Sequence, residues 1–197
     1  MKLTAIVMAA GMSKRMTVDK LHMKLNNKSI YEYVLDTIKQ HNFYEVIVVA
    51  KDDDILARAE SLGFVGVRNT TYQIGQSQSI KYGLEQAKSC NGFMFLVADQ
   101  PFIQAQTIHT LCERFCENKK SIIVPYYNGT RGNPVIFPYE LKNQLMSLEG
   151  DQGGKVVINQ NKDKIIGVDI TTKYEFMDID TIQDYEKILS IKTTISK

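Results

Sequence analysis

The chain has 197 residues, of which 44% are hydrophobic and 23% charged, values that are ordinary for a folded globular protein. A chain of this length suits one large domain with its own hydrophobic core. The formal net charge of +2 excludes the broad basic surface that binding to nucleic acid or an anionic membrane would need, so we expect neither partner.

The cysteines and the apolar segments predict a cytoplasmic protein. Cys90, Cys112 and Cys116 are odd in number and lack CxxC spacing, which favours reduced thiols over disulfides or a zinc site. No apolar run approaches the roughly 20 residues of a membrane-spanning helix. Residues 3–10 could pass for a signal-peptide core, but the basic pair at residues 14 and 15 follows the run instead of preceding it. A buried first strand is the better interpretation.

Strand-like and helix-like segments alternate along the chain. Short runs of Val, Ile and Leu predict strands at residues 3–8, 46–50, 65–68, 93–97, 121–125 and 164–169. Apolar residues at helical spacing predict helices at residues 29–41, 53–62, 77–89, 104–118, 151–160 and 181–191. Thr181 and Asp184 fit the first and fourth positions of a capping box, and residues 192–197 are expected to be a frayed tail.

The alternation predicts a single α/β domain over residues 1–191, with a largely parallel sheet covered by helices on both faces. Residues 128–133 hold two glycines and precede Pro134, which predicts a turn. We expect residues 135–137 to form an edge strand, because a proline cannot donate to a strand ladder. In parallel sheets ligands bind beyond the carboxyl ends of the strands, so the informative residues should follow the strands.

The segment after the first strand has the character of a phosphate-binding loop. It runs Ala9-Ala10-Gly11-Met12-Ser13-Lys14-Arg15-Met16, with Lys20 four residues later. Small residues allow a ligand to approach the backbone, and Arg15 and Lys20 could neutralise a polyphosphate. The segment lacks GxGxxG and GxxxxGK[ST], which argues against a Rossmann dinucleotide site and a P-loop NTPase. A plain turn with solvated basic residues explains it equally well.

Acidic residues at two other places suggest a metal site. Asp99 ends the third strong strand, and Mg²⁺ in proteins takes one or two carboxylates together with substrate phosphates. Asp178 and Asp180 precede the last helix, and either could face Asp99 as a second ligand. Each has a simpler explanation, since Asp99 can start a turn and the other two suit the N-terminal end of a helix.

A serine-rich segment, Gly75-Gln76-Ser77-Gln78-Ser79, precedes a predicted helix. Its amides and the hydroxyls of Ser77 and Ser79 could bind a base or a ribose, or could simply cap the helix. The three histidines show no spacing typical of metal ligands, and we predict no catalytic role for them.

Together these segments resemble the MobA-like nucleotidyltransferases, and within them the MocA-type molybdenum cofactor cytidylyltransferases. The resemblance runs from residue 3 to about 190 and rests on residues 8–16 with Lys20, 75–83, 98–101, 132–137, 150–155 and 178–184. It implies a three-layer α/β/α sandwich with a mostly parallel sheet, of the nucleotide-diphospho-sugar transferase type. It also implies Mg²⁺-dependent transfer of CMP from CTP to the terminal phosphate of molybdopterin, with release of pyrophosphate and a molybdenum hydroxylase as a candidate client.

The resemblance also implies residue roles. Nucleotide binding falls to Ala9, Ala10, Gly11, Ser77 and Ser79, catalysis to Arg15, Lys20 and Asp99, and metal binding to Asp99 and Asp180. The Ala9-Ala10-Gly11 triplet is typical of the cytidylyl branch, whereas guanylyl enzymes usually carry a second glycine there.

The sequence departs from the usual cytidylyltransferase pattern at Gln100, Asn133 and Gly154-Lys155, all on the acceptor side. Three alternatives therefore stay open: a sugar or polyol phosphate as acceptor, guanylyl transfer from GTP, and a non-catalytic carrier of the molybdenum cofactor.

Overall fold

A computed structural model describes the whole chain except residues 14, 17, 196 and 197. Its larger strands are β1 (Leu3–Ala9), β4 (Glu45–Ala50), β5 (Val65–Arg68), β6 (Gly92–Val97), β7 (Ile122–Tyr127), β9 (Val135–Pro138) and β10 (Ile165–Asp169). The helices are α1 (Ile30–Lys39), α2 (Asp53–Ser61), α3 (Gln76–Gln86), α4 (Ala105–Glu117), α5 (Lys142–Met146), α6 (Gly154–Gln160) and α7 (Ile182–Ile195). Every strand and helix predicted from the sequence is present, with ends that shift by a few residues.

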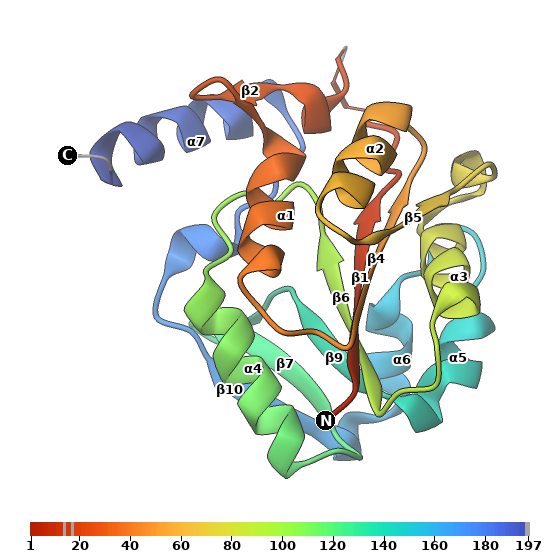
Figure 1. The fold of residues 1–197 in the computed structure, drawn as a ribbon. Coiled ribbons are helices and arrows are strands. Elements are labelled where there is room, and N and C mark those ends of the chain that lie inside the picture. The colour runs from red at the N-terminus through yellow and green to blue at the C-terminus, as the bar shows by residue number, and fades with distance from the viewer. Residues whose placement is uncertain (14, 17, 196–197) are drawn as a thin grey trace.

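The strands form one mixed sheet in the order β10-β7-β9-β6-β1-β4-β5 (Figure 1). β1 pairs in parallel with β4 and β6, β4 with β5, and β10 with β7. The mostly parallel sheet expected from the strand–helix alternation is confirmed.

The predicted edge position of residues 135–137 is wrong. Strand β9 lies inside the sheet, antiparallel to β6 on one side and to β7 on the other. All four of its residues are buried. Pro134 precedes the strand and therefore removes no hydrogen bond from its ladder, so the proline did not bear on where the strand lies.

Helices cover both faces of the sheet, which makes the molecule a three-layer α/β/α sandwich. Side chains of α1, α2 and α4 pack with Ala5 and Val7 of β1 in one core, whereas α3, α5 and α6 pack with Ile6 of β1 in the other. Figure 1 shows the first set of helices in front of the sheet and the second on its far side. Alternate β1 residues thus serve opposite layers, as the two-residue period of a strand requires.

Short elements that the sequence pattern did not predict complete the fold. β2 (Lys24–Leu25) and β3 (Lys28–Ser29) form a small hairpin. β8 (Thr130–Arg131), which lies within the predicted turn, pairs antiparallel with the end of β7. Two residues carry too little periodicity to signal a strand, and the five residues of α5 are too few to show a helical period clearly.

Helix α7 packs against the hairpin. Leu25, Ile30 and Ile179 form a third cluster with Ile188 of α7, and the two segments lie side by side at the top of Figure 1. The predicted capping box is confirmed: the Thr181 amide donates to Asp184 Oδ2 at 3.0 Å and the Asp184 amide to Thr181 Oγ1 at 3.2 Å. The helix runs to Ile195, so the expected tail is helical over residues 192–195.

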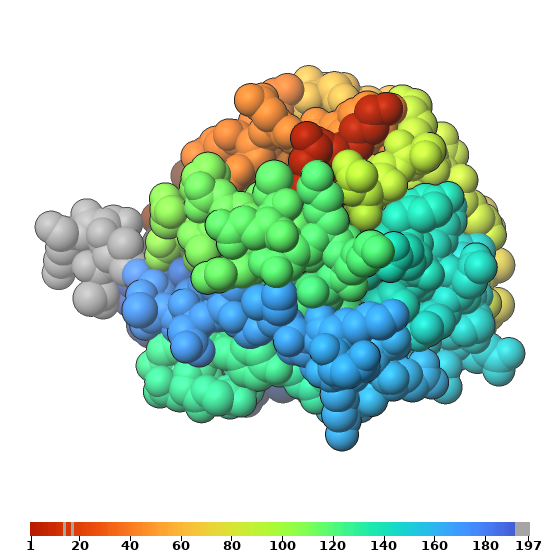
Figure 2. All heavy atoms as spheres, turned by 90° about the horizontal axis from the view of Figure 1, so that it is seen from below, coloured from red at the N-terminus to blue at the C-terminus, as the bar shows by residue number. Residues whose placement is uncertain are grey.

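The parallel strands run upward in Figure 1, so their carboxyl ends meet at the top of the molecule. Figure 2 shows the opposite end, where the first residues, α4 and the segment before β10 form the surface. Within the part of the chain that the structure describes, no helix combines the length and hydrophobicity required to span a bilayer.

Candidate active site

A cavity of about 400 Å³ opens at the carboxyl ends of β1 and β6. These strands are parallel neighbours with Met8 opposite Val97, so the loops that follow them leave the sheet side by side. The amide of Ala98 donates to the Met8 carbonyl at 3.2 Å and holds the two loops together. The cavity walls include Ala10, Gly11, Met12, Ser13, Arg15, Lys20, Tyr72, Gly75, Gln76, Ser79, Asp99, Asp151 and Asp180.

Lys20 is held in place by its own loop. It begins a 3-10 turn, η1 (Lys20–His22), which Asp19 caps by accepting the Leu21 amide at 3.1 Å. The Lys20 amide donates to Ser13 Oγ at 3.2 Å, and Ser13 has a positive φ of 49°. The first loop therefore folds back on itself and aims the lysine into the cavity.

The Lys20 ammonium joins two carboxylates from distant parts of the chain. Its Nζ lies 2.5 Å from Asp99 Oδ2 and 2.9 Å from Asp180 Oδ1. Arg15 reaches the other oxygen of Asp180 at 2.5 Å. The amide of Ile179 donates to the Asp99 carbonyl at 3.3 Å, and this backbone contact brings the second acidic segment to the first.

These contacts set the charge states of the cluster. Burial alone would lower the pKa of Lys20, but the Asp99 and Asp180 carboxylates outweigh it and the pKa is raised. Burial would raise the pKa of Asp180, but Lys20 and then Arg15 lower it. The lysine is therefore a cation and Asp180 an anion at neutral pH.

Asp178 completes an acidic mouth beside this cluster. Asp178 as a whole is an exposed residue, but its carboxyl group is partly shielded from water. This burial, together with the nearby charges of Asp99 and Asp180, raises the pKa of Asp178 to about 6. Gln100, which is buried, donates to Asp178 Oδ1 at 2.6 Å. Three carboxylates thus face one region, and the excess negative charge favours a cation there.

The other end of the cavity lies across β1 from the acidic mouth. Helix α3 and the 3-10 turn η2 (Tyr72–Ile74) follow β5, and β5 and β6 lie on opposite sides of β1 in the sheet. Ser79 and Gly75 line the cavity from this side.

Not every predicted nucleotide-binding residue reaches the cavity. Ala10, Gly11 and Ser79 line it, while Ala9 and Ser77 are buried and are not among its lining residues. Ala9 is the last residue of β1 and packs into the core, and the Ser77 amide donates to the Gly150 carbonyl at 3.1 Å. Lys14 lies outside the described residues.

A second cavity of about 560 Å³ adjoins the first and shares Met8, Gln76 and Asp151 with it. Its floor is apolar, from side chains such as Ile80, Phe95, Val124, Val135, Phe137 and Ile158. Its rim carries Arg131, Asn133 and Lys155. A flat, partly apolar molecule with an anionic group would match this lining.

Asp99 and Asp180 have the arrangement that a divalent cation needs. Their oxygens converge on one point, which the Lys20 ammonium shows by contacting both at hydrogen-bond distance. Carboxylate oxygens are the ligands that Mg²⁺ and similar hard cations take. The residues present therefore fit a divalent metal held together with substrate phosphates.

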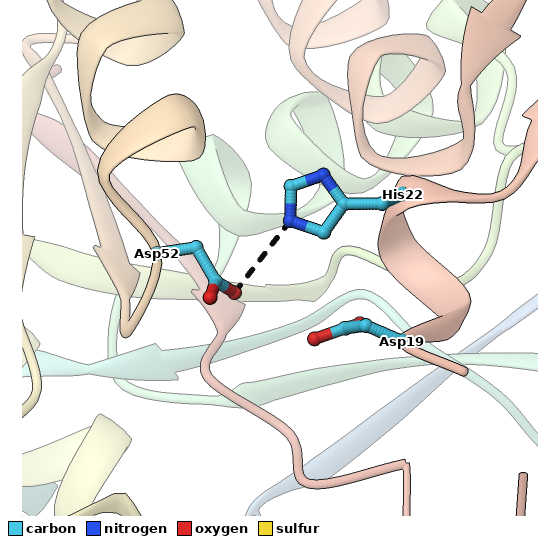
Figure 3. Close-up of side chains that lie close together, drawn as sticks. All are labelled: Asp19, His22 and Asp52. Atoms are coloured by element: carbon cyan, nitrogen blue, oxygen red, sulfur yellow. Dashed lines mark ion pairs between the residues drawn. The ribbon is translucent and has the colours of Figure 1, made fainter. Parts of the chain in front are cut away.

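A separate group, Asp19, His22 and Asp52, lies behind the first loop (Figure 3), with ligand atoms that lie within 4.8 Å of one another. His22 points toward Asp52 across 3.7 Å. Lys51 Nζ lies 2.5 Å from Asp19 Oδ2 and 2.8 Å from Asp52 Oδ2, much as Lys20 lies between Asp99 and Asp180, but none of the three residues of this group lines either cavity. We assign this group a structural role in holding the Lys20 turn to the loop after β4.

Sequence reasoning missed several cavity residues. Tyr72 lies in the wall without any motif that marks it, and Met12 belongs to the predicted phosphate-binding loop but has no role assigned from the sequence. In the sequence Gln100 is only a departure from the family pattern, whereas in the structure it donates to Asp178 Oδ1. The Asp19–Lys51 contact spans 32 residues and could not be found from local spacing.

Comparison with known proteins identifies the family and the fold. Residues 5–165 match the family model of the MobA-like NTP transferase domain. A probable molybdenum cofactor guanylyltransferase from Natranaerobius thermophilus is 28% identical over 127 residues, which cover 64% of this chain and 61% of that protein. A 2-C-methyl-D-erythritol 4-phosphate cytidylyltransferase from Lachnoclostridium phytofermentans is 33% identical over 130 residues, which cover 62% and 55%. The match thus spans somewhat over half the length of either relative.

Solved structures share the fold over nearly the whole chain. That of Rv0371c from Mycobacterium tuberculosis H37Rv aligns with a TM-score of 0.81 and 20% identity, covering 96% of this chain and 98% of the other. A structure of Rv0371c in complex with manganese aligns with a TM-score of 0.78 and 22% identity, covering 96% and 99%. With the family model spanning most of the chain, the predicted family and fold are confirmed: this protein belongs to the MobA-like NTP transferase family.

Proposed function

We propose that this enzyme transfers CMP from CTP to the terminal phosphate of molybdopterin and releases pyrophosphate. One observation carries the proposal: a cavity with a lysine bridging two carboxylates, one after β6 and one before α7, adjoins a second cavity with an apolar floor and a basic rim. Two adjacent cavities suit a reaction that joins two substrates, and the relatives named as guanylyl and cytidylyl transferases perform reactions of this class.

The substrates follow the charges of the two cavities. The triphosphate of CTP would lie against Arg15 and Lys20, and its base and ribose against Ala10, Gly11 and Ser79. Molybdopterin, a flat ring system that ends in a phosphate, would fill the second cavity, with the basic side chains of Arg131 and Lys155 available to its phosphate.

The mechanism needs positioning and charge neutralisation, not a protein nucleophile. A terminal phosphate oxygen of the acceptor attacks the α-phosphorus of CTP in line. The bond from that phosphorus to the bridging oxygen of the β-phosphate breaks, and pyrophosphate leaves with the electron pair. Lys20 and Arg15 neutralise the charge that builds on these oxygens. Mg²⁺, which we propose Asp99 and Asp180 hold, would supply further neutralisation of the phosphates when bound.

Cytosine is the proposed base because Ala10 lines the cavity with a methyl group. That group takes space that a purine would fill, and a glycine would leave it open. We therefore expect Ala10→Gly to raise kcat/KM with GTP relative to CTP. Gly63 does not line the cavity, so the control variant Gly63→Ala should leave the ratio of the two kcat/KM values unchanged. An unchanged GTP to CTP ratio in Ala10→Gly would contradict this basis of selectivity.

The direct test is to incubate the protein with Mg²⁺, molybdenum cofactor and each nucleoside triphosphate in turn. We expect pyrophosphate release with CTP and a product whose mass equals that of the cofactor plus CMP less one water. Parallel reactions with sugar and polyol phosphates test the alternative acceptors. Faster turnover with one of these would overturn the acceptor, faster turnover with GTP would overturn the nucleotide, and cofactor binding without any turnover would favour a carrier.

We also propose a cytoplasmic location, supported by three unpaired cysteines.

A further inference from the structure

A buried asparagine, Asn69, supports the wall of the first cavity at Ser79. Asn69 follows β5, is only 1% exposed, and does not line the cavity. Its Nδ2 donates to the hydroxyl of Ser79 at 3.1 Å, and Ser79 does line the cavity. Asn69 is therefore placed to act on a ligand through Ser79.

The orientation of the Asn69 side chain is fixed by a backbone contact. The amide of Thr71, which can only donate, lies 3.0 Å from Asn69 Oδ1. The oxygen must face Thr71, so the NH₂ group must face Ser79, and the opposite flip would put two donors together. The amide is thus committed as a donor to Ser79 Oγ.

This fixes what Ser79 can offer. A serine hydroxyl has one hydrogen to donate and lone pairs to accept with. Since Asn69 occupies a lone pair of the oxygen, the hydrogen points elsewhere, and among the described residues nothing accepts it. Ser79 is 6% exposed and its open side is the cavity. A buried donor without a partner favours a ligand that brings an acceptor.

We propose that Asn69 is a positioning residue that sets the Ser79 hydroxyl as a hydrogen-bond donor to an acceptor atom of the nucleobase, either a carbonyl oxygen or an unprotonated ring nitrogen. This rests on the proposed function, because it needs a nucleotide whose triphosphate lies at the Lys20 end. Asp99, which Lys20 contacts, follows β6, whereas Ser79 lies on the side of β5, on the other side of β1. The base is therefore expected next to Ser79 when the phosphates lie against Lys20.

The test measures CTP binding by calorimetry in Ser79→Ala, Asn69→Asp and the double variant. The carboxylate introduced by Asn69→Asp would still accept the Thr71 amide but would also accept the Ser79 hydroxyl, which turns the hydrogen away from the base. One hydrogen bond corresponds to a loss of roughly 2- to 12-fold in affinity. We expect each single variant to lose affinity in that range and the double variant to lose no more than Ser79→Ala alone.

A matched control removes a bond between the same two segments outside the cavity. Tyr82→Phe deletes the 3.0 Å contact of Tyr82 with Thr70, which also joins the loop after β5 to α3, and we expect unchanged CTP affinity. If losses from Asn69→Asp and Ser79→Ala add in the double variant, Asn69 acts on the fold alone and the proposal is wrong.

A second measurement keeps Asn69 native, in case Asn69→Asp does not fold. The analogue 3-deaza-CTP lacks the ring acceptor at N3, and 2-thio-CTP weakens the acceptor at C2. We expect the wild type to bind one of them more weakly than CTP, and Ser79→Ala to show no such difference. Equal discrimination in both proteins would overturn the proposal, whereas a wild type that binds no nucleoside triphosphate would instead overturn the proposed function.

Discussion

Replacing Lys20 by alanine separates a catalytic lysine from one that only stabilises the fold. The Lys20 ammonium lies 2.5 Å and 2.9 Å from two carboxylates and lines the cavity proposed for the triphosphate. When phosphate binds, this cation is placed to meet charge that is larger in the transition state than in the ground state, so its loss should lower kcat and not only raise KM. Loss of a comparable donor costs on the order of 10²–10³ in rate, equivalent to about 2.7–4 kcal/mol of activation free energy.

The chain offers a closely matched control. Lys51 bridges two carboxylates at 2.5 Å and 2.8 Å, and its side chain is 17% exposed against 10% for Lys20. It does not line the cavity. Both alanine variants lose a bridging cation, so both should lower the melting temperature, but only Lys20→Ala should lower kcat by the stated factor. The assay is steady-state pyrophosphate release with saturating CTP and acceptor, beside a thermal melt. Equal kcat values in the two variants would refute the reasoning.

Three other outcomes follow from the geometry. Asp99→Asn should abolish turnover and leave the protein folded, because it removes a charge with little change of shape, although the loss of its ion pair with Lys20 should lower the melting temperature; near-normal pyrophosphate release would contradict its role. Gly75→Ala should lower the free energy of unfolding by about 1–3 kcal/mol or more in urea melts, since Gly75 has φ +135° and a Cβ would lie 2.3 Å from the facing backbone. Gly63→Ala, with φ +78° and open space around it, should cost less, and an equal cost would show that the close approach does not matter. The third outcome concerns pH. Burial would raise the pKa of Asp19, but its contact with Lys51 holds the pKa below its usual value. The stabilising contribution of a carboxyl with a depressed folded pKa is present above its unfolded pKa and is lost as pH falls through the folded value. The difference in unfolding free energy between wild type and Asp19→Asn should therefore be constant near neutral pH and shrink below about pH 4. A difference that does not change with acid would show that the pair contributes nothing through charge.

The sequence alone determined the layers of this protein and much of its chemistry. A continuous apolar strand such as Leu3–Ala9 buries its side chains only when both faces of the sheet are covered. The helical periodicity of the segments between the strands predicts the helices that cover them. The same logic placed functional residues after strands, which located Lys20 and Asp99 near the carboxyl ends of β1 and β6.

Only the tertiary structure decided which distant residues meet. Sequence placed Asp178 and Asp180 near a helix start, and the backbone contact of Ile179 with Asp99 is what brings them to the cavity. The same holds for Asn69, whose effect on Ser79 depends on a bond across the β5–α3 connection. The order of the strands in the sheet could not be predicted from the sequence pattern either. Pro134 shows that one backbone N–H is missing, but it does not show which strands lie beside β9. Local periodicity encodes exposure of single residues, whereas contacts between segments arise from packing the whole chain at once.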